Sequence, residues 1–468
     1  MKLKQKARTA AHRLPAVLAL LLAALTTVGV VRVYALGGQA LASMTVAERR
    51  AISTTVDITA QDYNANTRPD RYSVYGSIST SDGVALFGPT VDQSGLSPAF
   101  ASLIGLVGED NSARTRYVAA NYLDQLLPDI DYSPLTGIPA GAAAELTLTI
   151  SSAVQEGVYA WLTERGVQGC VFAYDYVGGD ILCMASTPGA HWRDTAALEG
   201  SYLNKNLYNT TPGSTMKLVT LLLLLQQGFD PAELTFSCQG SYTLRADGEA
   251  VRCTGTHGTL NGVNALGRSC NCWFAQAIEQ LDPAQAAADL KEMGCQVNGN
   301  ELSTLGAIPR SSTCVTLGTA WDFDSVWSLI GQGATLVSPI DMAVLAGQCA
   351  AGGGAALPRL LAGQETELSR FGQSHPELFQ RLGALWRQAY GDCYPVEDYS
   401  GAIIAAKTGT ADELGADGER TQKLLCGCSE ELHTAFYIVI ENAQIGETDL
   451  EVTTAEVANR LMELLSAL

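Results

Sequence analysis

The sequence predicts a compact α/β domain, of the α+β type, that begins near residue 145 and runs to the C-terminus. Residues 146–150 (LTLTI) alternate between apolar and polar side chains, as in a half-buried strand, and residues 151–163 have the apolar spacing of a helix. Residues 170–176 and 180–185 then resemble two strands around a Gly-Gly pair, which is typical of a tight hairpin. A strand, a helix and a hairpin in this order indicate mixed α/β architecture.

The composition is that of a folded protein with a large apolar core. The chain has 468 residues, of which 47% are hydrophobic and 16% charged. These values exclude a disordered or collagen-like chain. The formal net charge is −19, and so acidic a surface repels phosphate backbones. Nucleic-acid binding is therefore excluded as a function.

The N-terminus has the pattern of a membrane anchor. Residues 14–31 carry no charge, and with residues 33–36 the run approaches the roughly 20 residues that span a bilayer. Five basic residues precede it, which predicts a cytoplasmic tail at 1–13, a transmembrane anchor at 14–36 and an exported remainder. The expected location is the cell membrane, with a single span. The alternative is a cleaved signal peptide, for which residues 40–42 (ALA) offer a cleavage site.

The segment between the expected anchor and the α/β domain differs from both in amino-acid composition. Residues 37–144 are rich in small and hydroxyl side chains, and residues 72–87 are their clearest strand-like stretch. We expect a small N-terminal module at 37–144 and the main domain at 145–468. Within the latter, residues 412–433 are expected to form a long loop, and the last seventeen residues an amphipathic helix.

Three short motifs in the main domain carry residues suited to nucleophilic chemistry. Ser214 and Lys217 lie on the first turn of a predicted apolar helix, where a spacing of three places them on one face. A serine hydroxyl needs a base, and a buried lysine whose pKa is lowered can serve as one. An S-x-x-K pair also arises by chance about once in a chain of this length.

The other two motifs are equally weak when taken alone. Ser269-Cys270-Asn271 precedes a helical stretch and offers a hydroxyl for proton relay and an amide for a substrate carbonyl, although an N-cap serine would look the same. Lys407-Thr408-Gly409-Thr410 follows a short apolar strand and suits a carboxylate and a peptide edge. Beyond residue 36 the chain has only five lysines, and two of them fall inside these motifs in the right order.

Together the motifs resemble those of the penicillin-recognising serine enzymes, S-x-x-K, S-x-N and K-T-G. Residues 146–188, 212–217 (PGSTMK), 257–260 (HGTL), 331–343 and 407–411 (KTGTA) are similar to the transpeptidase domain of penicillin-binding proteins. Residues 75–86 resemble, more loosely, the module that links the anchor to that domain. The resemblance covers about 320 residues. It implies an antiparallel sheet flanked by helices, with a helical subdomain and the active site between them.

The resemblance also implies a role for each motif residue. Ser214 is the acylated nucleophile and Lys217 its general base, while Ser269 and Asn271 relay a proton and hold substrate. Substrate-binding residues on the third motif are Lys407, Thr408, Gly409 and Thr410. Backbone N–H groups of Ser214 and Thr410 would form the oxyanion hole. No cofactor is implied.

The chain length favours one subclass, a monofunctional (class B-like) D,D-transpeptidase. Only 108 residues separate the expected anchor from Glu145, too few for a glycosyltransferase domain. The implied partners are stem peptides ending in D-Ala-D-Ala, β-lactams, the membrane and a membrane glycan polymerase. The alternatives are a D,D-carboxypeptidase or β-lactamase of the same fold, or a non-catalytic β-lactam sensor or cell-wall scaffold. Whether the role is in division or elongation is left open.

Four further residues between and beside the first two motifs have ligand chemistry. Cys238, Cys253, His257 and Cys270 would make a tetrahedral zinc site of the closed, structural kind. The residues between the two first cysteines are expected to form a hairpin around Asp247-Gly248 that brings those cysteines together. A Cys238–Cys253 disulfide and free buried thiols are the two competing interpretations. The sequence leaves all three open.

Overall fold

The structure is a computed structural model. It describes residues 22, 25–28, 30–32, 76–88, 91, 96–105, 117–126, 131–132, 139–140, 145–189, 203–415, 418–445 and 448–468. Most of the expected anchor at 14–36 and of the expected N-terminal module lies outside these residues. The parts of the anchor that are described are helical. Within the described ranges, no helix combines the length and the apolar character that a bilayer span requires.

The chain divides into two compact units. The larger comprises residues 78–87, 91–122 and 146–468, and the smaller comprises residues 1–77, 88–90 and 123–145. In the smaller unit, β3 (Asp131–Tyr132) pairs antiparallel with β4 (Pro139–Ala140). Part of the segment expected to form a separate N-terminal module thus belongs to the larger unit. The division at residue 145 stays a prediction.

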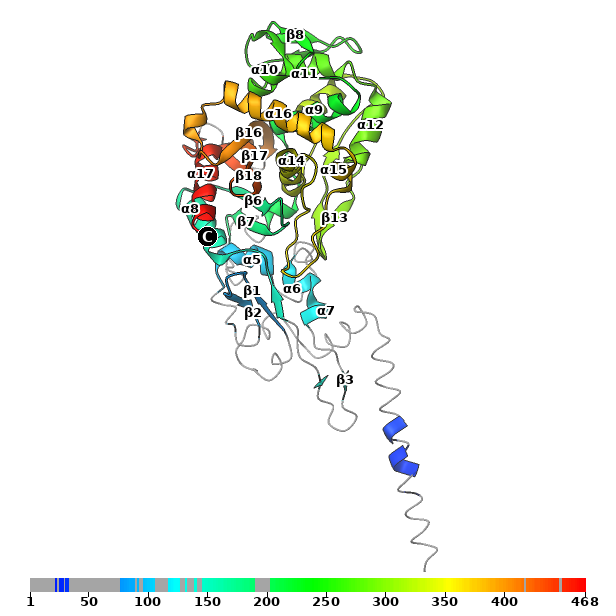
Figure 1. Cartoon of the computed structure of the whole chain (residues 1–468), viewed down its shortest axis with the longest axis vertical. Coiled ribbons are helices and arrows are strands. Elements are labelled where there is room, and N and C mark those ends of the chain that lie inside the picture. The colour runs from blue at the N-terminus through cyan, green and yellow to red at the C-terminus, as the bar shows by residue number, and fades with distance from the viewer. Residues whose placement is uncertain are drawn as a thin grey trace, which may run out of the picture. The chain divides into compact units, whose positions relative to one another are not determined.

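A long antiparallel sheet forms the centre of the larger unit (Figure 1). Its strand order is β16-β17-β18-β6-β7, with β19 paired to β18. The strands are β6 (Gly169–Asp175), β7 (Ile181–Thr187), β16 (Ile403–Gly415), β17 (Gly418–Ser429), β18 (Thr434–Ile445) and β19 (Thr448–Asp449). The expected hairpin is therefore β6–β7. The expected antiparallel sheet flanked by helices is confirmed.

Helices cover both faces of this sheet. On one face, apolar side chains of α8 (Ser152–Glu164) and α17 (Thr454–Ser466) pack with Ile438 and Leu425. Side chains alternate along a strand, so the neighbouring residues point to the opposite face. There the thiol of Cys426 contacts the Met342 carbonyl of α14 (Pro339–Ala351). The third motif lies on β16, the outermost strand of this path.

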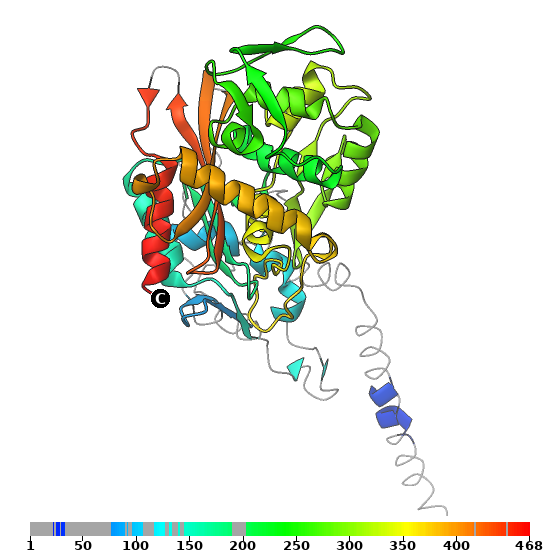
Figure 2. The same ribbon diagram turned by 45° about the horizontal axis from the view of Figure 1, so that its top comes forward.

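A mainly helical region adjoins the sheet on the side that bears α14. It contains α9 (Lys217–Gln226), α10 (Gly262–Gly267), α11 (Asn271–Ile278), α12 (Pro283–Glu292) and α13 (Phe323–Ile330). Helix α16 (Pro376–Cys393) contacts α9, α10, α14 and β16, and so joins this region to the sheet (Figure 2). The first two motifs therefore lie on helices that face the strand bearing the third.

The remaining elements of the described chain are short. They are β1 (Ser77–Ser79), β2 (Ala85–Phe87), α5 (Pro98–Ile104), α6 (Val118–Asn121), α7 (Leu123–Leu126), β5 (Glu145–Thr147), β8 (Thr235–Cys238), β9 (Ser241–Thr243), β10 (Ala250–Arg252), β11 (Gly258–Asn261), β12 (Gln296–Val297), β13 (Leu302–Leu305), β14 (Ile308–Ser311), β15 (Cys314–Val315) and α15 (Arg370–Ser374). The expected hairpin around Asp247-Gly248 is present as the antiparallel pair β9–β10.

The expectation of a long loop at residues 412–433 is wrong. Strand β16 continues through Asp412 to Gly415, and β17 returns from Gly418 to Ser429, with residues 405–415 and 418–428 paired in continuous register. Acidic residues and glycine disfavour strands in general, which is why the segment looks like a loop. Backbone pairing between the two strands outweighs that local preference, and Asp412 is exposed at the edge of the sheet.

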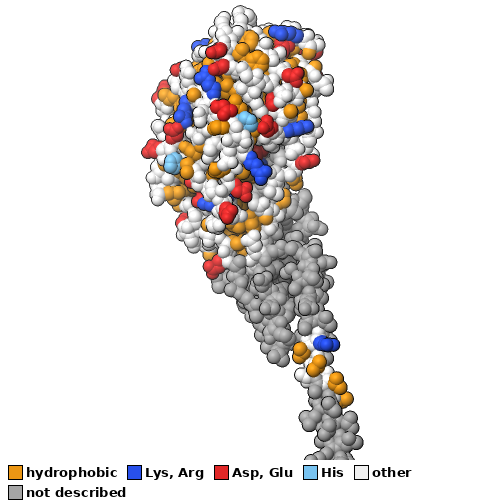
Figure 3. Space-filling model, turned by 45° about the vertical axis from the view of Figure 1, so that its right-hand side comes forward, with side chains coloured by type: hydrophobic (Ala, Val, Ile, Leu, Met, Phe, Trp, Pro, Cys, Tyr) orange, Lys and Arg blue, Asp and Glu red, His pale blue; other side chains and the backbone are white. Residues whose placement is uncertain are grey.

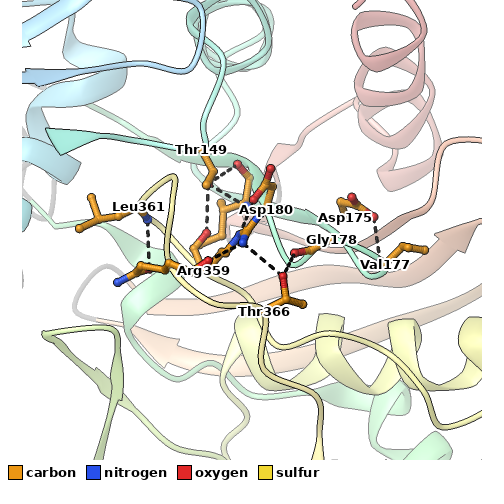
Figure 4. A network of polar contacts seen from close by, with 10 residues as sticks. Thr149, Asp175, Val177, Gly178, Asp180, Arg359, Leu361 and Thr366 are labelled. Atoms are coloured by element: carbon orange, nitrogen blue, oxygen red, sulfur yellow. Dashed lines mark hydrogen bonds and ion pairs between the residues drawn. The ribbon is translucent and has the colours of Figure 1, made fainter.

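Polar contacts hold the start of the domain to the sheet (Figure 4). The Thr149 hydroxyl accepts a hydrogen bond from Ile181 N at 3.0 Å, and Arg359 Nε donates to Asp180 Oδ1 at 2.6 Å. Asp82 accepts hydrogen bonds from the backbone N–H and hydroxyl of Ser152, and thereby caps α8. The Asp82–Ser152 bonds join residues 78–87 to the rest of the larger unit.

On the one face drawn in Figure 3, charged side chains of the described residues are dispersed and form no single-sign patch. On the face drawn in Figure 3, acidic and basic side chains are interspersed with apolar ones over the described residues. That face has no basic stripe of the kind that tracks a phosphate backbone.

Candidate active site

Ser214 lies on a 3₁₀ turn that leads directly into α9. The turn is Gly213–Met216, and α9 continues from Lys217. Gly213 has φ +51°, and a Cβ at this position would lie 2.6 Å from the Thr410 carbonyl oxygen. Only glycine combines that backbone conformation with so close an approach. The turn is therefore pressed against β16, which places Ser214 beside the third motif.

Lys217 is the centre of the polar contacts. Its Nζ lies 2.8 Å from Ser214 Oγ. It also lies 3.1 Å from Ser269 Oγ, 2.8 Å from the Ser269 carbonyl oxygen and 2.7 Å from Asn271 Oδ1. The structure thus brings together the four residues expected to be catalytic. Ser214 is partly exposed, whereas Lys217 is fully buried.

The environment of Lys217 favours its neutral form. Burial is the largest cause that holds the pKa of its amine well below the ordinary value, because a charged group loses solvation there. The positive charge of Lys407 lowers that pKa further, while the nearby Cys253 and Cys270 oppose the shift. A neutral amine beside a hydroxyl is able to accept the hydroxyl proton.

Ser269 and Asn271 flank the start of α11. Ser269 has φ +54°, a left-handed conformation that is uncommon outside glycine. Asn271 is the first residue of α11, and its Nδ2 donates to the Arg252 carbonyl at 3.0 Å. This bond orients the amide so that its oxygen faces Lys217. The backbone around Cys270 therefore determines where both side chains point.

Lys407 reaches the same cluster from the sheet. It is 1% exposed, and its Nζ lies 3.2 Å from Ser269 Oγ and 2.7 Å from the Thr408 carbonyl oxygen. The Ser269 hydroxyl therefore lies between two lysine amines. Burial lowers the pKa of Lys407 to about 7, so its charged form is present in neutral and acidic solution.

The other residues of the third motif are arranged along the edge of β16. Thr410 is exposed, and its carbonyl accepts a hydrogen bond from Gln332 Nε2 at 3.1 Å. Its backbone nitrogen would lie 2.8 Å from a Cβ on Gly213, so the turn that carries Ser214 and this N–H are close neighbours. A Cβ on Gly409 would lie 2.7 Å from the Pro212 carbonyl.

One residue at the site, Tyr394, belongs to none of the three motifs. The Tyr394 hydroxyl accepts a hydrogen bond from the Thr408 backbone N–H at 3.0 Å and lies 3.1 Å from the Thr408 hydroxyl. It thus holds the strand where the motif begins. No local signal in the sequence marks Tyr394, because its partner is 14 residues away and on another element.

The cysteines beside the site are also brought together. Every cysteine of the chain lies in the described residues, and each is a free thiol. Cys238, Cys253, His257 and Cys270 each offer one ligand atom, and these four atoms lie within 4.8 Å of one another. The expected convergence of the four residues is therefore present, and the two cysteines of the alternative disulfide are separate thiols.

Solved structures with the same fold include penicillin-binding proteins. Penicillin-binding protein A of Mycobacterium tuberculosis has a TM-score of 0.66 at 18% identity, covering 84% of this chain and 99% of that one. A D,D-transpeptidase domain from Eggerthella lenta has 0.64 at 19%, covering 84% and 98%. Pseudomonas aeruginosa PBP2 has 0.65 at 19%, covering 84% and 95%. A search by sequence among curated proteins finds no match.

A family model matches the sequence itself. The model describes the penicillin-binding protein transpeptidase domain and covers residues 169–463, which is more than half of the chain. This range contains all three motifs and the whole cluster around Lys217. The chain therefore belongs to the penicillin-binding protein transpeptidase family.

Proposed function

We propose that the chain is a peptidoglycan D,D-transpeptidase that works through an acyl-enzyme at Ser214. The observation that carries the proposal is the contact of 2.8 Å between Ser214 Oγ and a buried lysine amine whose pKa is lowered. A hydroxyl paired with a neutral base is the requirement for nucleophilic attack on an unactivated amide. Family membership supports the reaction class, and the D-Ala-D-Ala substrate is our own inference.

In the first half of the proposed reaction, Ser214 Oγ bonds to the carbonyl carbon of the penultimate D-Ala, and its proton passes to Lys217 Nζ. Backbone N–H groups of Ser214 and Thr410 stabilise the negative oxygen. The C–N bond then breaks, and the terminal D-Ala leaves with a proton delivered from Lys217 through the Ser269 hydroxyl. The distances from Ser269 Oγ to both lysines support this relay.

In the second half, the amine of a neighbouring stem peptide attacks the ester on Ser214. The amine gives up one proton through the same relay, a peptide bond forms, and the proton returns to Ser214 Oγ as the ester bond breaks. Asn271 contacts the donor peptide in both halves, whereas Lys407 in its charged form binds the terminal carboxylate in the first half, before the terminal D-Ala leaves. In that first half, Thr408 and Thr410 bind the carboxylate and the donor backbone along β16.

A β-lactam would follow the first half of this path and stop there. Solved structures of Mycobacterium tuberculosis penicillin-binding protein A include acyl-enzyme complexes with imipenem and penicillin G. We propose the same adduct at Ser214 here. Labelling by a fluorescent penicillin tests it, with Ser214→Ala as the variant and Ser303→Ala, a half-buried serine of β13, as the matched control. The label should be lost only in Ser214→Ala. An adduct on another residue in peptide mass spectrometry contradicts the proposal.

A second experiment distinguishes a transpeptidase from the alternative functions. Purified protein is given a peptide ending in D-Ala-D-Ala, with and without a D-amino acid as acceptor. A transpeptidase forms the exchanged peptide in proportion to the acceptor. A D,D-carboxypeptidase only releases D-Ala, and a β-lactamase turns over penicillin rapidly. A sensor or scaffold shows none of these three reactions.

We further propose that residues 14–36 anchor the protein in the cell membrane with the catalytic domain outside, beside a membrane glycan polymerase. The charge-free run after a basic leader supports this topology. Protease added to intact cells stripped of wall should degrade the domain. Full protection contradicts the topology, and a mature N-terminus near Ser43 would show that the segment is cleaved.

A further inference from the structure

We propose that Cys238, Cys253, His257 and Cys270 bind one Zn²⁺ ion in a closed tetrahedral site, and that this ion positions the Ser269–Asn271 segment. The four ligand atoms lie within 4.8 Å of one another. Three sulfurs and one imidazole nitrogen are the ligand set of structural zinc sites. The proposal concerns a metal that the reaction proposed above does not require.

Three of the six distances between the ligand atoms match the edges of a zinc tetrahedron, and all six are within 4.8 Å. With Zn–S bonds of about 2.3 Å and a Zn–N bond of about 2.0 Å, two sulfurs lie about 3.8 Å apart and a sulfur and a nitrogen about 3.5 Å apart. Cys253 Sγ and Cys270 Sγ are 3.8 Å apart. His257 Nδ1 is 3.6 Å from Cys238 Sγ and 3.5 Å from Cys253 Sγ.

Hydrogen bonding alone does not account for this arrangement. His257 Nδ1 carries either one proton or one lone pair, yet it faces two sulfurs at nearly equal distance. A cation shared by all four atoms explains why they converge on one point. A disulfide would bring two sulfurs to about 2.0 Å and leave the imidazole and the third thiol without a role.

The ligands come from elements with little apolar core of their own. Cys238 ends β8, Cys253 follows β10, and His257 directly precedes β11. In the β8–β11 pair, Cys238 lies opposite Gly258, beside His257. These strands have three or four residues each, so a bound metal would supply the cross-link that fixes them.

The site is also shielded from solvent. Cys238 and Cys270 are fully buried, and the other two ligands are partly buried. A site with four protein ligands leaves no open position, which makes the zinc structural.

The link to the active site is covalent. Cys270 stands between Ser269 and Asn271, both of which contact Lys217 Nζ. Ser269 is held at φ +54°, a conformation that needs support from its surroundings. Metal bound to Cys270 would fix the backbone of the Ser269–Asn271 segment at its middle residue. The four ligands are therefore positioning residues, since none of them contacts Ser214 or Lys217 through a hydrogen bond among the described residues.

Metal analysis tests the site without any assay of activity. The full-length protein, purified without chelator, should contain about one equivalent of zinc when it is measured by inductively coupled plasma mass spectrometry. Cys253→Ser should lose it, and Cys393→Ser, a partly buried cysteine outside the cluster, should keep it. Replacement of zinc by Co²⁺ in the wild type should give the intense bands of tetrahedral cobalt with thiolate ligands.

Several outcomes overturn the metal site. They are less than about a tenth of an equivalent of zinc, a Cys238–Cys253 disulfide in peptides mapped without reduction, and equal zinc in Cys253→Ser and wild type.

The positioning role is tested on the wild type alone, so that a misfolded variant cannot obscure the answer. Removing zinc with a chelator should slow penicillin acylation about tenfold or more, and restoring zinc should recover the rate. Acylation that is unchanged in zinc-free protein overturns the positioning role.

Discussion

The contact between Gly213 and β16 makes a quantitative prediction for Gly213→Ala. The new Cβ would lie 2.6 Å from the Thr410 carbonyl oxygen and 2.8 Å from its nitrogen. Ordinary contact begins at 3.4 Å, so the turn and the strand must separate by about 0.8 Å, and both partners are backbone. A displacement of about 1 Å between reacting groups costs about a hundredfold in rate. We therefore expect penicillin acylation of Ser214 to slow by about 30- to 100-fold.

The matched control is Gly228→Ala. Gly228 has φ +83° but nothing within 4 Å of its Cβ position. Both variants carry the backbone cost of a left-handed alanine, about 1 to 2 kcal/mol, and both should melt at lower temperature than wild type. Only Gly213→Ala should also lose acylation rate, measured under conditions where both variants are folded. Acylation of Gly213→Ala within about threefold of wild type would show that the turn is not fixed by β16.

Three further predictions concern the side chains near Ser214. Lys217→Met, which keeps most of the side-chain volume, should slow acylation by about a hundred- to ten-thousandfold because the base is lost; an adduct formed at the normal rate in mass spectrometry contradicts its role. The second-order rate constant for acylation should rise with pH as Lys217 loses its proton and fall above about pH 7 as Lys407 loses its own; a penicillin methyl ester, which has no carboxylate, should not show the fall. Tyr394→Phe should lower the free energy of unfolding by about 1 kcal/mol and slow acylation, because Thr408 loses both bonds to the hydroxyl; Tyr399→Phe from the same aromatic cluster is the control, and equal effects of the two variants would contradict a specific role.

Local patterns predicted the elements that local interactions dominate. The glycine pair after Tyr176 marks the turn of the β6–β7 hairpin, and the apolar run after Lys217 marks α9. Both features depend on residues next to one another in sequence. The convergence of the three motifs came from the resemblance to a family, because no periodicity in the sequence says that Lys407 faces Ser269, 138 residues away.

Long-range pairing accounts for what the sequence did not predict. Residues 412–415 look like a loop in isolation and become a strand because β17 pairs with them. Tyr394 acquires its role only when α16 ends beside β16. The cysteine cluster is an intermediate case, since its ligand types and spacing are visible in the sequence, whereas its distances of 3.5 to 3.8 Å require the fold.

The place of β16 in the sheet has a consequence for inhibition. No described strand pairs with its outer side, so an extended ligand can join the sheet there as a further strand once the Gln332 side chain leaves the Thr410 carbonyl. Binding of that kind depends on backbone groups, which side-chain mutations alter little. A non-covalent compound with alternating donors and acceptors along β16, and an anionic end toward Lys407, would need no reactive ring. Because β-lactamases act by hydrolysing the β-lactam ring, they would not inactivate such a compound.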